Sequence, residues 1–253
     1  MPTPKKGYFL KDGTKVPGVT TILGKFKDPG ALMYWAWNVA HEGLEPALFL
    51  LEGWWKGEGN KEATERLLTT PRDHWHYRKR SGMAAEIGTV VHAMVELHLT
   101  GRRAEDALVA LTGNPESISK AETCFLGFLQ WAEQNKLKVL RTELALVSER
   151  HRYGGTLDAC VLSINGRTCI GDWKTSNAIY ADHLIQVGGG YRPLYIENFP
   201  DEKVDAGAYI FRFAKDSGDF HVHHFEDVTG AAEAFLPMRA LYDLTKELHK
   251  RFA

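Results

Sequence analysis

The chain has 253 residues and a mass of 28.4 kDa, and its 44% hydrophobic and 25% charged residues are typical of an ordinary globular protein with a full core. It contains no long low-complexity tract, no repeat period and no apolar run of membrane-spanning length, which excludes disordered, solenoid and membrane-spanning classes. The net charge of −1 comes from 31 basic and 32 acidic residues, so contact with nucleic acid would need local basic patches.

Apolar spacing predicts helices in the first half of the chain, at residues 31–40, 83–99, 104–111 and 120–134. After Arg141 the pattern changes to strands at 142–148, 156–164, 168–173, 207–213 and 220–225, with helices at 181–197 and 230–251. We therefore expect an α/β protein with a mixed central sheet flanked by helices and a helical N-terminal part. We expect a single domain, 1–253, in which 1–82 form a helical extension and 83–253 the core.

Residues 72–80 interleave four fixed positive charges with two aromatic rings. Such a segment could contact phosphates and stack on bases, or it could be a solvated charged turn before a helix. The candidate DNA-binding residues in it are Arg72, Trp75, Tyr77, Arg78, Lys79 and Arg80.

Two acidic positions flank the predicted hairpin at Asn165-Gly166. A two-residue turn would place Asp158 opposite Trp173, with Asp172 on the other face of the sheet. A three-residue turn with a bulge at Gly166 would place Asp158 directly opposite Asp172, and Lys174 would share their face. We predict the second arrangement, in which the two carboxylates could share an ion.

Burying two acids and a lysine in apolar strands is costly unless something compensates their charge. A hard divalent cation would compensate the acids, and a buried Asp–Lys ion pair is the alternative. On the predicted helix 83–99, Gly88, His92 and Glu96 share a face, although a lone helical histidine is more often a hydrogen-bonded core residue than a ligand.

These motifs occur in an order that resembles the PD-(D/E)XK nuclease superfamily, in particular its RecB-like exonuclease branch with CRISPR-associated, phage and mitochondrial genome-maintenance members. The resemblance covers residues 88–195 and is carried by Gly88-Thr89-x-x-His92, Glu143, Gly155-Thr-Leu-Asp158, Asp172-Trp173-Lys174 and Gln186. The earlier segment 16–23, followed by Leu32 and Trp35, is also similar to the N-terminal part of phage and mitochondrial-type members.

The resemblance implies a restriction-endonuclease-like fold and a Mg²⁺ or Mn²⁺ site. It assigns metal binding to His92, Asp158, Asp172 and the Trp173 carbonyl, and catalysis to Lys174 with Asp158, Asp172 and Gln186. Glu96 and Glu143 are further candidates.

Family members usually carry Gln-x-x-x-Tyr, whereas here Gly190 takes the tyrosine's place and Tyr191 follows Gln186 at five residues. Either the run Gly188-Gly189-Gly190 distorts the helix or the tyrosine's role, which includes contact with DNA, is absent.

Cys160 and Cys169 fall in predicted core strands and only Cys124 remains, so we expect no iron–sulfur cluster. A second metal position, His221 with His223 on a predicted edge strand, has no accompanying carboxylate or cysteine.

The sequence thus predicts a metal-dependent DNA exonuclease acting on single-stranded DNA or DNA ends. We expect it in the cytoplasm of a bacterial or phage-infected cell, in DNA repair or recombination, with protein partners from a recombination or replication system. The alternatives are a non-catalytic DNA-binding or assembly module and a hydrolase of other phosphate esters.

Overall fold

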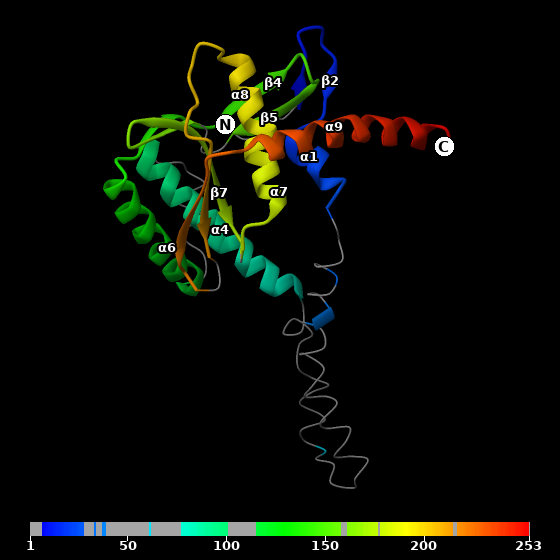
Figure 1. Cartoon of the computed structure of the whole chain (residues 1–253). Coiled ribbons are helices and arrows are strands. Elements are labelled where there is room, and N and C mark those ends of the chain that lie inside the picture. Colours follow the sequence, from blue (N-terminus) through cyan, green and yellow to red (C-terminus); the bar gives the residue numbers. More distant parts are fainter. Residues whose placement is uncertain are drawn as a thin grey trace. The chain divides into compact units, whose positions relative to one another are not determined.

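The structure is a computed structural model that describes residues 7–27, 33, 37–38, 61, 77–100, 115–157, 161–176, 178–214 and 217–252, without the side chains of 77–85 and 100 (Figure 1). Its internal contacts divide the chain into two compact units, Met1–Lys27 with Glu86–Ala253, and Asp28–Ala85. The first unit holds all the described strands and the Asp172 region discussed below. In the described ranges, no helix is long and apolar enough to cross a membrane.

The described elements alternate between short strands and longer helices. In chain order they are β1 (Tyr8–Phe9), β2 (Lys15–Val16), α1 (Val19–Gly24), α4 (Tyr77–Thr100), α6 (Pro115–Gln134), β3 (Lys138–Arg141), β4 (Leu144–Ser148), β5 (Tyr153–Leu157), β6 (Val161–Ile164), β7 (Arg167–Thr175), α7 (Ala181–Leu184), the π-helix η2 (Ile185–Tyr191), α8 (Arg192–Asn198), β8 (Ala208–Phe213), β9 (Phe220–Phe225) and α9 (Thr229–Lys250).

The main sheet has the order β3-β6-β7-β8-β9, so β7 is its middle strand. β7 and β8 run parallel and are joined through α7, η2 and α8, whereas the other neighbours are antiparallel. β4 and β5 form a separate antiparallel pair, as do β1 and β2. The prediction of an α/β protein with a mixed sheet and flanking helices is therefore confirmed.

Successive residues of β7 point to opposite faces of the sheet, and each face has its own core. Cys169 and Trp173 pack with α4 and α6, and Ile170 packs with α1, η2, α8 and α9. In Figure 1, α4 and α6 accordingly lie on one side of β7, and α7 and α8 lie on the other. Asp172 and Lys174 alternate with Trp173 and so face η2.

The turn between β6 and β7 differs from the prediction. Ile164 pairs with Arg167, so Asn165-Gly166 is a two-residue turn, and the predicted three-residue bulged turn is wrong. Asn165 and Gly166 both have left-handed backbone, with φ of 50° and 84°. A turn with two left-handed residues twists in the same sense as the strands it joins, and Asn-Gly adopts it at little cost.

The predicted strand 156–164 is also two strands. β5 pairs with β4, and β6 pairs with β3 and β7. Side-chain alternation therefore cannot be counted from the hairpin back to Asp158, because 158–160 lie outside the described residues.

Three consecutive glycines allow neighbouring helices to approach η2 closely. A Cβ added to Gly188 would lie 2.8 Å from Val228 Cβ, and one added to Gly190 would lie 2.6 Å from Val19 Cγ1. A Cβ on Gly189 would overlap the backbone carbonyl of Ala231 in α9. Side chains at these positions would therefore separate η2 from α1 and α9.

Gly189→Ala should lower the free energy of unfolding by about 2 kcal/mol, because the backbone of α9 cannot yield as a flexible side chain can. Gly230→Ala is the matched control, since a Cβ there meets nothing within 4 Å. Because Gly230 lies in α9, that control should be neutral or slightly stabilising. Denaturant unfolding of both variants measures the difference, and equal stability would contradict the close-packing explanation.

Candidate functional site

Asp172 lies on the middle strand, and its carboxylate is fully buried. Lys174 Nζ is in ion-pair contact with Oδ2. Neither carboxylate oxygen accepts a well-oriented hydrogen bond from the part of the chain that the structure describes. The ammonium of Lys174 is the counter-charge that the structure places on this buried carboxylate, and a cation at the oxygens without a well-oriented hydrogen bond would add to that compensation.

Lys174 is also held by an acceptor in the π-helix η2. Its Nζ donates to Gln186 Oε1 at 2.9 Å, and Gln186 Nε2 donates to the Tyr191 hydroxyl at 2.7 Å. Asp172, Lys174, Gln186 and Tyr191 thus form one polar chain from β7 to η2. The Lys174 side chain is 17% exposed, so this end of the polar chain is open to solvent in part.

The π-helix explains how a tyrosine five residues after Gln186 reaches it. In a π-helix the backbone hydrogen bond joins residues i and i+5, so the residue that stacks on Gln186 is Tyr191. The glycine run does distort the helix, and of the two alternatives left open by the shifted spacing, this is the one observed. The phenol of Tyr191 occupies a buried position beside the amide of Gln186.

His92 approaches the same strand from α4, which packs on the Trp173 face of the sheet, and it is close enough for the charge of Asp172 to act on it. Gly88, one turn earlier, allows the approach, since a Cβ there would lie 2.6 Å from Thr175 Oγ1. Burial lowers the pKa of His92, the negative charge of Asp172 opposes that shift, and Lys174 adds to it. His92 is therefore neutral near pH 7, the form in which imidazole binds metals.

A cavity of about 180 Å³ lies beside His92. Glu96, Glu143 and Trp173 also line it, together with Leu99 and Thr142. Both glutamates named as further candidates in the sequence are thus next to the histidine. Carboxylate oxygens and a neutral imidazole are a donor set that suits Mn²⁺ as well as Mg²⁺.

Asp172 and His92 each have the donor chemistry that suits a divalent cation. Asp172 contributes buried oxygens without hydrogen-bond partners, and His92 contributes a neutral nitrogen. Within the described ranges, no group of three or more His, Cys, Asp or Glu side chains is close enough to hold a metal ion. Asp158, the third ligand implied by the resemblance, directly follows β5 in the sequence and lies outside those ranges.

The predicted basic segment lies outside the residues whose side chains the structure describes. Arg72 and Trp75 lie outside the described residues. Tyr77, Arg78, Lys79 and Arg80 form the first turn of α4, and their side chains are not described. Their contact with DNA stays a prediction.

His183 is a residue near the site that the sequence did not indicate. It lies in α7, and its side chain is only 13% exposed. Burial lowers its pKa, the charge of Lys174 lowers it further, and Asp182 and Asp172 oppose the shift. Nothing in the local sequence indicates that His183 lies near Lys174, because the approach of α7 to β7 depends on the whole connection between β7 and β8.

Stability should fall below pH 6.5 because of His183. A histidine with a lowered folded-state pKa binds its proton more readily in the unfolded chain, so unfolding becomes more favourable as pH decreases from 6.5 through the folded-state pKa. Denaturant unfolding between pH 7.5 and 5 in the presence of a chelator would show this decline. His183→Gln should make it shallower, and an unchanged pH dependence would contradict the assignment.

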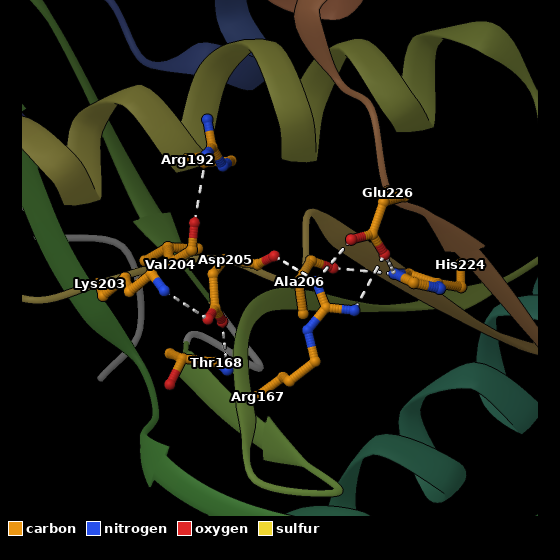
Figure 2. A network of polar contacts seen from close by, with 9 residues as sticks. All are labelled: Arg167, Thr168, Arg192, Lys203, Val204, Asp205, Ala206, His224 and Glu226. Atoms are coloured by element: carbon orange, nitrogen blue, oxygen red, sulfur yellow. Dashed lines mark hydrogen bonds and ion pairs between the residues drawn. The ribbon is translucent and has the colours of Figure 1, made fainter.

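The histidine cluster of β9 lies on an edge strand, as predicted, but His224 belongs to a different network (Figure 2). Its Nε2 lies 2.9 Å from the Ala206 carbonyl and 3.2 Å from Glu226 Oε2. Figure 2 shows Glu226 paired with Arg167, whose guanidinium also reaches the Asp205 carbonyl. These contacts attach the start of β7 to the segments before β8 and after β9.

Comparison of the chain with protein-family models and with curated proteins finds no match.

Proposed function

We propose that the protein is a metal-dependent DNA exonuclease of restriction-endonuclease-like fold that hydrolyses phosphodiester bonds in single-stranded DNA or at DNA ends. The observation that carries the proposal is the fully buried Asp172 carboxylate, whose oxygens lack hydrogen-bond partners among the described residues, next to a lysine oriented by Gln186. The mixed sheet with helices on both faces supports it. So does the order of the motifs along the chain.

Asp172 and His92 would hold the ion, and the resemblance adds Asp158 and the Trp173 carbonyl. A bound divalent ion supplies an activated water and neutralises charge on the phosphate. The residues of the chain then have separate tasks. Lys174 places a positive charge where negative charge develops on phosphorus, and Gln186 fixes its direction by accepting one of its three N–H groups.

The Gln186–Tyr191 hydrogen bond fixes the amide orientation in turn. With Nε2 donating to the Tyr191 hydroxyl, Oε1 is left to face Lys174. The ammonium therefore needs no rearrangement during the reaction, which is the condition under which a charge stabilises a transition state most.

A substrate panel tests the proposal. Wild-type protein is incubated with Mn²⁺ or Mg²⁺ and single-stranded DNA, duplex DNA, RNA or simple phosphate esters, with Asp172→Asn as the inactive control. Cleavage of DNA from an end, lost in Asp172→Asn, is the expected result. Binding of DNA without cleavage would instead indicate a non-catalytic module, and hydrolysis of the small esters alone would indicate a different hydrolase.

Asp158→Ala should lower the cleavage rate at least about a hundredfold, because it removes one of the carboxylates that the resemblance assigns to the metal. Asp201→Ala, an acid exposed after α8, is the control and should cleave at the wild-type rate. Steady-state cleavage rates at saturating Mn²⁺ measure both. A wild-type rate for Asp158→Ala would remove it from the site.

A further inference from the structure

Two adjoining pockets lie along α9, and none of their lining residues belongs to the Asp172 site. The first, about 480 Å³, is formed by the N-terminal segment, the β4–β5 turn and α9, and its lining includes Lys15, Arg152, Arg239 and Lys246. The second, about 470 Å³, is lined by Lys25, Phe26, Tyr242, Thr245, Lys246 and His249. Since Tyr242 and Lys246 line both pockets, we treat them as one basic groove.

The charge of the groove is strongly positive. Asp243 is the acid among its lining residues, and it is paired with Arg239 at 2.7 Å. Arg239 is buried and also donates two hydrogen bonds, of 3.0 and 2.8 Å, to the Arg152 carbonyl. Lys15, Lys25 and Lys246 make no ion pair with an acid that the structure describes. No described acid therefore neutralises these three charges.

The scaffold of the groove is rigid where it meets the core. Arg239 joins α9 to the β4–β5 turn through the Arg152 carbonyl. Tyr8 lies across Gly18 and Gly154, where added Cβ atoms would collide with its ring. The charged side chains therefore project from fixed backbone positions, which lowers the ordering cost of binding.

We infer that the basic groove binds the sugar-phosphate backbone of single-stranded DNA outside the cleavage centre, an inference that rests on the proposed function. Regularly placed lysines and arginines neutralise phosphates and release their counterions, which supplies most of the affinity of such contacts. Tyr242 and Phe26 add aromatic surface beside these charges, the combination found where single strands are bound without sequence preference.

The groove is one strand away from the candidate site. The Tyr8 hydroxyl, at the groove, is hydrogen-bonded to Thr156 Oγ1 at 2.9 Å. On the opposite face of β5, a Cβ on Gly155 would lie 2.9 Å from the ring of Tyr191, the end of the Lys174–Gln186–Tyr191 chain. DNA held in the groove is thus kept near Asp172 without entering the cleavage centre.

Metal-free DNA binding tests this inference separately from cleavage. The full chain is titrated in chelator with a labelled single strand of about 30 nucleotides, longer than the site of one small binding domain. Lys15→Ala/Lys246→Ala should weaken binding about tenfold and reduce the slope of log K against log salt by about 1.4, since each charge contributes about 0.7. Lys136→Ala/Lys138→Ala, two exposed lysines at β3, is the matched control and should bind as wild type does.

If Lys15→Ala/Lys246→Ala binds DNA with wild-type affinity and salt slope, the inference that the groove binds DNA is wrong. An equal loss of affinity in the control variant would also contradict it. A polyglutamate peptide that displaces the DNA at similar concentration would overturn the choice of a phosphate ligand. Groove-dependent binding by a protein that cleaves nothing in Mn²⁺ would overturn the nuclease proposal alone. Cleavage of DNA by a protein whose DNA binding does not depend on the groove would contradict the groove inference and leave the nuclease proposal standing.

Discussion

Lys174→Met should lower the rate of DNA cleavage at least about a hundredfold and should also destabilise the metal-free protein. The loss of rate follows because the ammonium held by Gln186 is the positive charge nearest Asp172 and is already oriented. The loss of stability follows because Asp172 would then be buried without its counter-charge. Removing one partner of a buried ion pair costs roughly 3 kcal/mol.

The double variant Asp172→Asn/Lys174→Met separates the two effects. It should recover most of the lost stability, because an amide carries no charge to bury, while its cleavage stays at the level of the single variant. Denaturant unfolding in chelator and cleavage assays in Mn²⁺ measure the two properties. If Lys174→Met is as stable and as active as wild type, the ion pair has neither a structural nor a catalytic role.

Added divalent ion should stabilise the Lys174→Met protein more than it stabilises wild type. In the variant, Asp172 has lost the ammonium, so a cation is the remaining means of compensating its charge. This readout does not depend on activity, and it therefore tests the metal-binding role of Asp172 in a protein that cannot cleave. The stabilisation is measured by denaturant unfolding with and without Mn²⁺, and Ca²⁺, which also prefers oxygen ligands, can be used in its place.

Elements with a clear periodicity could be predicted from the sequence. The strand at 220–225 has the predicted bounds, and the helix predicted at 230–251 is α9, Thr229–Lys250. β3 (Lys138–Arg141) was missed because a short edge strand with a charge at each end resembles a loop. The prediction of one strand at 156–164 failed for a different reason, since no local signal in the sequence shows that β5 and β6 belong to different sheets.

The site was predictable as a set of residues and much less as a geometry. Asp172 and Lys174 share a face through strand alternation alone, as expected. The three-residue turn was predicted because it would bring the two carboxylates to one face, but Asn165 and Gly166 both adopt left-handed backbone and form a two-residue turn. Tyr191 depends on a π-helix that three glycines permit, and periodicity of 3.6 residues would have placed it on another side of the helix.

His92→Ala should raise the Mn²⁺ concentration that gives half-maximal cleavage about a hundredfold and should raise that for Mg²⁺ much less. The imidazole is neutral because burial lowers its pKa, and it would be the nitrogen donor in a site otherwise made of oxygens. Nitrogen ligands contribute more to the affinity for Mn²⁺ than for Mg²⁺, so their removal lowers the preference between the two metals.

A histidine on the same helix provides the control for His92. His98 is exposed, it meets Phe125 and Phe128 edge to face, and it does not line the cavity beside His92. His98→Ala should leave both half-saturation concentrations unchanged even where it lowers thermal stability. If His92→Ala behaves in the same way, with lower stability and an unchanged Mn²⁺ requirement, then His92 is a core residue that packs α4 against β7, and the metal is held by carboxylates alone.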